Sequence, residues 1–152
     1  MASSEELTFT PAHPPTPKAL EAFTVVQHAI KAALVKSRHD WDIHEPRMWA
    51  RAAPLSDHEL AGFVLENDLV ECRSAPTSYG TIILGKIRIP AVGDAEGEGF
   101  VHVRIHDPPN RGTEDVRFHS IWTDEGRPSE DAQPTSWRAI QTRETPLEFF
   151  NE

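Results

Sequence analysis

The chain has 152 residues, of which 38% are hydrophobic, and this length suits one ordinary domain with a modest core. Its formal net charge of −9 repels polyanions, which argues against general nucleic-acid binding. No apolar run approaches the roughly 18 residues that a membrane span needs, and the opening MASSEELTFT lacks the features of a signal peptide. We therefore expect a cytoplasmic protein with no nucleic-acid or membrane partner.

The sequence contains one cysteine, Cys72. A single cysteine excludes both an internal disulfide and a structural zinc site built from several cysteines. Nothing in the surrounding LVECRSAP marks an activated thiol, so we expect a buried or half-buried side chain rather than a nucleophile.

The N-terminal half predicts helices after a flexible, proline-rich arm over residues 1–15, and we assign residues 16–152 to one domain. Thr16 and Pro17 suit the cap and first position of a helix over residues 16–37. That helix carries one apolar stripe with a spacing of three or four residues, formed by Leu20, Phe23, Val26, Ile30 and Leu34.

A second helix is expected after an irregular linker over residues 38–54. Ser56 and Glu59 have the spacing of a capping box, in which each side chain bonds the backbone N–H of the other residue. We expect this helix to end near Asn67 or Asp68.

The C-terminal half has the two-residue period of strands, over residues 79–92, 99–107, 114–124 and 135–143. The first two connections between these runs are short, which favours antiparallel pairing. Together these features predict an α+β fold with two N-terminal helices on one face of an antiparallel sheet of about four strands.

The alternation divides the expected sheet into two different faces. One face is apolar and suits the core: Ile83, Ile87, Ile89, Val101, Val103, Ile105, Val116, Phe118, Trp122 and Trp137. The other face is rich in bases, with Ile82, Leu84 and Ile121 among them: Lys86, Arg88, His102, Arg104, His106, Arg117, His119 and Arg138. Like charges across neighbouring strands repel each other, so such a face needs water, acidic neighbours or a bound anion.

The basic face supports the hypothesis of a small ligand-binding domain for an anionic or carbonyl-containing molecule. Arginine bonds carboxylates and phosphates through two parallel hydrogen bonds, and histidine exchanges protons near neutral pH. The expected ligand-binding residues are Lys86, Arg88, Arg104 and Arg117, and the candidate catalytic residues are His102, His106 and His119. If the protein is an enzyme, a cofactor-independent isomerase, cyclase or lyase is the type that requires the fewest special features of the sequence.

Two other interpretations of the same face stay open. It can be an ordinary solvated surface, in which long basic side chains cover the sheet. It can also be an interface, either with acidic loops or with a partner protein, including a second copy in a homodimer. A concave face favours the ligand and a flat face favours the partner, and the sequence does not determine the curvature.

Metal binding has weaker support. His39, Asp40, Asp42 and His44 lie close together in sequence, but they equally suit a polar linker. Alternate positions on a strand are about 7 Å apart, and His102 and His106 are separated by two such steps. They are therefore too far apart for both to bind one ion with His119. We expect no metal and no cofactor.

Overall fold

The computed structural model describes residues 8–94, 97–108, 115–124 and 137–150. Its helical elements are α1 (Pro17–Val25), α2 (Gln27–His44), η1 (Pro46–Ala52), α3 (Asp57–Leu60) and α4 (Leu65–Asp68). None of the helices in these residue ranges is long and apolar enough to cross a bilayer.

The first predicted helix is two helices. Thr16 caps α1, since its hydroxyl accepts a hydrogen bond from the backbone N–H of Ala19 at 3.1 Å, and Pro17 follows it as expected. The chain leaves helical geometry at Val26 (φ −104°, ψ 11°) and resumes as α2. The prediction of an irregular linker from residue 38 was wrong, because α2 continues to His44 and ends before Pro46, which begins η1.

The second predicted helix is also interrupted. The capping box at Ser56 is confirmed: its hydroxyl accepts from the N–H of Glu59 at 3.1 Å, and the Glu59 carboxylate accepts from the N–H of Ser56 at 2.9 Å. However, α3 stops at Leu60, and the chain reaches Asp68 only through the separate single turn of α4.

The cap at Ser56 should contribute measurably to stability. Ser56→Ala removes the acceptor for one N–H of the first turn and is expected to lower the free energy of unfolding by about 1 kcal/mol. Urea unfolding monitored by circular dichroism measures this loss. An unchanged midpoint with an unchanged slope would contradict a stabilising cap.

The sheet within the described residues is an antiparallel meander in the order β1-β2-β3-β4. Its strands are β1 (Leu69–Thr77), β2 (Gly80–Asp94), β3 (Gly97–Asp107) and β4 (Arg117–Ile121). The predicted α+β architecture is therefore confirmed, but one strand is different. Residues 69–77 form a strand that the sequence pattern did not indicate, whereas the described part of 135–143 makes only isolated bridges at Arg138 and Gln141.

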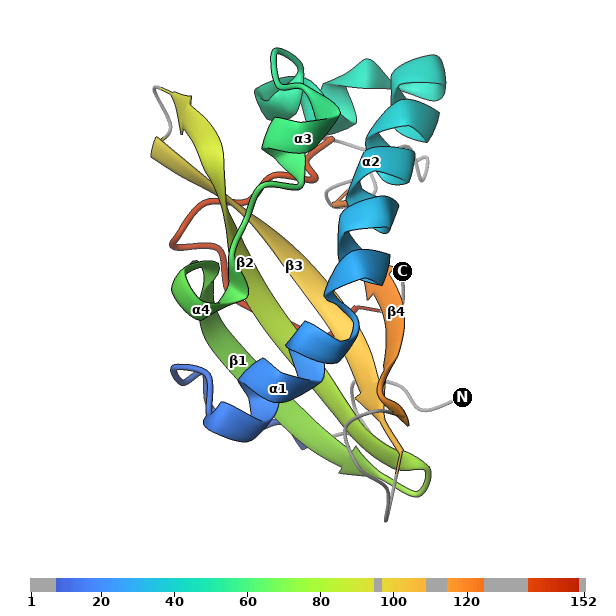
Figure 1. Cartoon of the computed structure of the whole chain (residues 1–152), viewed down its shortest axis with the longest axis vertical. Helices are drawn as coiled ribbons and strands as arrows, with labels where there is room; N and C mark the ends of the chain where they lie inside the picture. Colours follow the sequence, from blue (N-terminus) through green and yellow to red (C-terminus); the bar gives the residue numbers. More distant parts are fainter. Residues whose placement is uncertain (1–7, 95–96, 109–114, 125–136, 151–152) are drawn as a thin grey trace, which may run out of the picture.

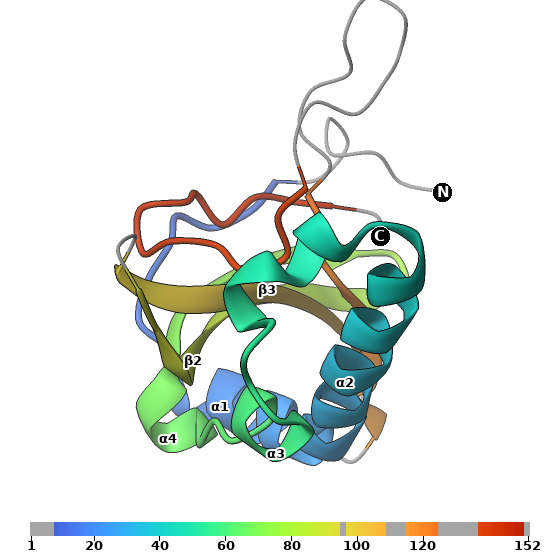
Figure 2. The same ribbon diagram turned by 90° about the horizontal axis from the view of Figure 1, so that it is seen from above.

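The molecule has three layers, which Figures 1 and 2 show from two directions. The helices lie on one face of the sheet, and the later part of the C-terminal segment (residues 137–150), drawn in red, crosses the opposite face. We call the helix side the inner face and the other side the outer face. The inner face and the helices enclose the main core, which includes Phe23, Ile30, Leu34, Ile87 and Val103.

The alternation predicted the inner face correctly in β2 and β3 but not at the end of β4. Trp122 packs in the outer cluster and Ile121 in the main core, the reverse of the expectation. The reason is a register shift between β3 and β4. Ile105 pairs with Phe118 whereas Arg104 pairs with Ser120, so His119 is an extra residue that inverts the faces after it.

The segment before α1 runs along the free edge of β1, on the side away from β2. The N–H of Thr10 donates to the carbonyl of Ser74 at 2.9 Å, and His13 and Cys72 form an antiparallel bridge with hydrogen bonds of 3.1 and 2.8 Å. The described part of the predicted arm is thus attached to the sheet through its backbone.

Candidate functional site

The outer face carries the basic residues predicted for a ligand site, and the C-terminal segment covers it. Leu147 and Phe150 are buried against Ile82 and Leu84, and Phe9, Trp122 and Phe149 pack around them. The outer face is therefore an apolar layer as well as a basic one, and its covering comes from the chain itself.

Three basic side chains from three neighbouring strands donate to backbone carbonyls of this segment. On β1, Arg73 donates to Leu147 at 2.8 Å. On β2, Lys86 donates to the carbonyls of Arg143 and Thr145 at 2.7 and 2.6 Å. On β3, Arg104 donates to Phe150 at 2.8 Å, and its guanidinium lies 4.8 Å from the centre of the Phe149 ring. Carbonyl oxygens thus occupy Lys86 and Arg104, two of the donors that we expected to bind an anion.

The remaining predicted ligand-binding residues, Arg88 and Arg117, have other surroundings. Arg88 donates to the buried carboxylate of Asp68 at 2.9 Å and to Glu98 at 3.0 Å, so it has acidic partners within the chain. Arg117 is exposed at the start of β4 and pairs in register with His106. The basic residues therefore do not form one uninterrupted open surface.

The three candidate catalytic histidines have three different environments. His102 is fully buried and stacks on Trp122 with 5.3 Å between ring centres. The Nε2 of His106 is 2.9 Å from the carbonyl of Tyr79, and the Nδ1 of His119 is 2.6 Å from the hydroxyl of Ser120. Of the predicted site residues, the structure places His102 directly opposite Lys86 across β2 and β3.

The pair of His102 and Lys86 is basic, and both residues are buried. Burial, reinforced by the positive charge of Lys86, lowers the pKa of His102 to about 3. Burial also lowers the pKa of Lys86, against the attraction of Glu71. Among the described residues, no hydrogen-bond partner reaches either ring nitrogen of His102. The anion site and the interface proposed for this face stay predictions, and any ligand or partner must compete with the C-terminal segment.

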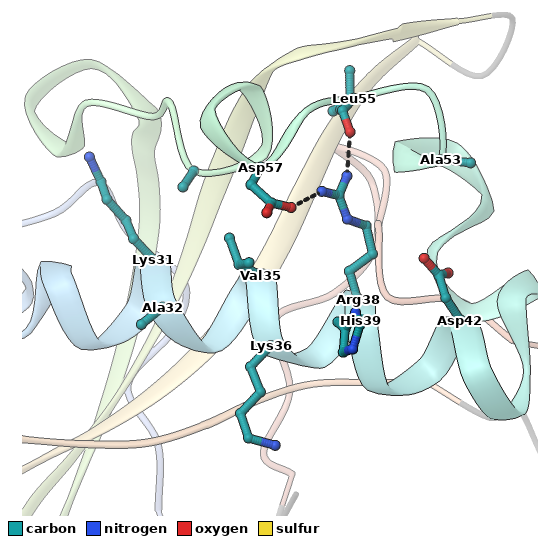
Figure 3. A pocket seen from close by; sticks show the side chains of 11 residues that line it. Lys31, Ala32, Val35, Lys36, Arg38, His39, Asp42, Ala53, Leu55 and Asp57 are labelled. Atoms are coloured by element: carbon teal, nitrogen blue, oxygen red, sulfur yellow. Dashed lines mark hydrogen bonds and ion pairs between the residues drawn. The ribbon is translucent and has the colours of Figure 1, made fainter.

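A wide groove lies between α2 and the loop that leads to α3 (Figure 3). Its volume is about 840 Å³, and Val35 and Leu55 contribute to its apolar lining. Arg38 crosses it and donates to the carbonyls of Ala52 and Leu55 at 3.1 and 2.7 Å, as well as to Asp57. These bonds pin the loop to α2 and leave Arg38 occupied, so the groove is open but its central cation already has partners.

A smaller cavity of about 230 Å³ lies at the end of the sheet, between the inner face and the segment that enters α1. We call it the end cavity. Its strand wall comes from β1, β2 and β3, and its other wall from residues 13–19. The polar or reactive side chains that line it include His13, Lys18, Cys72, Ser74, Thr81 and Asp107.

Asp107 is the unusual residue of the end cavity. It is only 8% exposed, and among the described residues no hydrogen-bond donor reaches its Oδ1. Leaving a buried acceptor without a donor costs about 1–3 kcal/mol, and more when the group is charged. Gly80, at φ +130°, lets the chain approach closely here, since a Cβ would lie 2.2 Å from the carbonyl oxygen of Asp107.

The sequence contained a signal for Asp107 that our prediction missed. Val101, Val103 and Ile105 point inward, and two residues further the same alternation places Asp107 on the apolar face. An acidic residue in a core-facing strand position is rarely left buried without a partner. This mismatch, rather than the row of bases, marks the end cavity.

The other groups of the end cavity limit its chemistry. Cys72 is buried, as expected, and burial raises the pKa of its thiol to about 12, so the thiol stays neutral and is a poor nucleophile. In the described part of the chain, no group of three or more His, Cys, Asp or Glu side chains is placed to hold a metal ion. His39, Asp40, Asp42 and His44 instead follow one another along the last turns of α2.

Comparison with known proteins adds no relative: no family model matches the chain, and no match is found among curated proteins or solved structures.

Proposed function

We propose that this protein is a small-molecule-binding domain and that its ligand occupies the end cavity. The observation that carries the proposal is the buried carboxylate oxygen of Asp107, which has no donor among the described residues and belongs to a side chain that lines a cavity. A ligand that donates a hydrogen bond to the Asp107 carboxylate would offset part of the cost of burying that group. Its binding free energy would include this gain.

The surroundings of Asp107 support binding rather than a purely structural cavity. The hydroxyl-bearing Thr81 lies directly opposite Asp107 in the β2–β3 register, and Ser74 pairs with Ile83, one inward position further along. Polar side chains of three strands therefore converge at one end of the inner face. A few convergent polar groups on an otherwise apolar wall are typical of ligand sites.

The proposal retains the class of function predicted from the sequence, but it places the site on the opposite face of the sheet. The bases of the outer face have a structural role instead, because they donate hydrogen bonds to carbonyls of the C-terminal segment.

A fragment screen by NMR tests the proposal. We expect small polar fragments to shift backbone amide signals of residues that line the end cavity, including Ser74, Thr81 and Asp107. Thr81→Leu adds apolar volume to the wall and should weaken binding at least about tenfold, or 1.4 kcal/mol. Thr24→Leu, at an exposed position of α1 outside the lining, is the matched control and should bind like the wild type.

The screen also has an outcome that overturns the proposal. If a broad set of polar fragments leaves these amides unshifted at millimolar concentration while both variants remain folded, the end cavity is not a ligand site. Equal weakening by Thr81→Leu and Thr24→Leu would likewise contradict the assignment.

A further inference from the structure

The size of the end cavity restricts its ligand. Its volume of about 230 Å³ is below the roughly 300 Å³ at which pockets for drug-sized ligands begin. A nucleotide or another multi-ring cofactor would not fit within it. The ligand that fills this cavity is therefore a molecule of few non-hydrogen atoms.

The strand wall requires a hydrogen-bond donor on that molecule. Asp107 in its ionised form only accepts hydrogen bonds, and one of its oxygens lacks a donor among the described residues. An ammonium group or a hydroxyl group would supply one. A ligand that carried only a carboxylate would instead be repelled by Asp107.

The opposite wall carries the opposite charge. Lys18 is exposed at the start of α1, and His13 lies beside the strand bridge to Cys72. The Nδ1 of His13 lies 2.7 Å from the carbonyl of Pro14, which makes this nitrogen the donor and leaves Nε2 of the neutral ring as an acceptor, so the positive charge of this wall is that of Lys18. A ligand that carried only an ammonium group would leave the charge of Lys18 without an anionic partner from the ligand.

We infer that the end cavity binds a small carboxylic acid that also carries a hydrogen-bond donor, that is, an amino acid or a hydroxy acid. Its donor would bond Asp107 on the strand wall, and its carboxylate would lie toward Lys18. The hydroxyls of Ser74 and Thr81 can donate or accept, so they adapt to either end of the molecule. This inference specifies the ligand class of the proposed binding function and depends on it.

Four probes of similar size separate the two ends of the ligand. Alanine carries a carboxylate and an ammonium group, and lactate a carboxylate and a hydroxyl. Propionate carries the carboxylate alone, and ethanolamine carries donors without a carboxylate. In NMR titrations of the full chain, we expect alanine or lactate to shift the lining amides with an affinity at least about tenfold above that of propionate and ethanolamine.

Substitutions at the two walls should act on different ends. Asp107→Asn keeps an acceptor but removes the charge, so it should weaken alanine at least about tenfold and lactate less. Lys18→Gln should weaken alanine and lactate alike. Asp42→Asn changes an exposed aspartate of α2 that lines the wide groove and should leave both affinities unchanged. Because Lys18 is exposed, its variant keeps the test valid even if Asp107→Asn destabilises the fold.

The outcomes distinguish this inference from the function on which it depends. Tightest binding by ethanolamine or propionate would overturn the inference and leave the binding function intact. So would a fragment screen that finds a ligand in the end cavity while none of the four probes binds. A screen that finds no ligand there would overturn both.

Discussion

Replacing His102 with phenylalanine should make the fold markedly less sensitive to acid. The pKa of His102 is about 3 in the folded protein, against 6.5 for the ordinary imidazole, because burial disfavours its charged form. Between these values the unfolded chain binds a proton that the folded protein does not. The stability linked to this histidine is therefore complete above about pH 6.5 and is lost as the pH falls toward 3.

The expected size of this effect is large for one residue. The slope approaches 1.4 kcal/mol per pH unit inside the window, and the loss between pH 7 and pH 5 is about 2 kcal/mol. Urea unfolding at pH 7, 6 and 5 measures it. The phenylalanine variant keeps a ring against Trp122 and should lose about 2 kcal/mol less than the wild type over this range.

His119 provides the control, since it is exposed on the bulged part of β4. His119→Gln should keep the acid sensitivity of the wild type. If His102→Phe keeps it as well, His102 takes up its proton in the folded protein, and its side chain must then reach water or a hydrogen-bond acceptor.

Phe23→Ala should be among the most destabilising single substitutions in the main core, with an expected loss of about 3–5 kcal/mol. Phe23 is fully buried on α1, and its ring lies over Gly85 of β2. A Cβ at position 85 would be only 2.4 Å from Cζ of Phe23. The ring occupies the space that the missing side chain leaves on the inner face.

This contact predicts coupling between the two positions. Gly85→Ala should cost about 1–3 kcal/mol, because the added methyl group overpacks the core. In Phe23→Leu/Gly85→Ala the smaller residue makes room for that methyl group, so the double variant should be more stable than the sum of the single variants. Thermal or urea unfolding of the four proteins completes the cycle. Additive losses would mean that α1 does not pack on β2 at Gly85.

The pattern of apolar residues predicted most of the inner face because burial on one side leaves a simple period. The alternation in β2 and β3 and the spacing in α1 and α2 each predicted residues that are buried. The cap residues Thr16 and Ser56 were equally visible, since their hydroxyls act within three residues along the chain. Local rules of this kind need no knowledge of distant contacts.

The failures share a different cause, which is contact between residues far apart in the sequence. The bulge at His119 depends on how β4 pairs with β3, and no residue pattern in β4 alone reveals an extra residue. The role of Lys86 and Arg104 depends on a segment more than 40 residues later, whose carbonyl oxygens have no side-chain signature. Strand β1 was missed because its polar residues, including Arg73, bond the terminal segments instead of following an alternation.

The candidate site divides in the same way. The bases of the outer face could be read from the sequence, but their partners could not. Asp107 stood at an inward position of a strand and was visible as a mismatch. That it lines a cavity follows only from the close approach of residues 13–19 to the sheet.

The attachment of residues 10–13 to β1 has a consequence for sheet growth. A strand at the edge of a sheet offers free N–H and C=O groups to any other extended chain, which is a common route to fibre formation. Here Thr10 and His13 already engage the backbone of β1 at Ser74 and Cys72. The segment itself is interrupted by Pro11 and followed by Pro14 and Pro15, which have no N–H to offer a further strand. Along this stretch the prolines make the covering segment a poor template for fibrils.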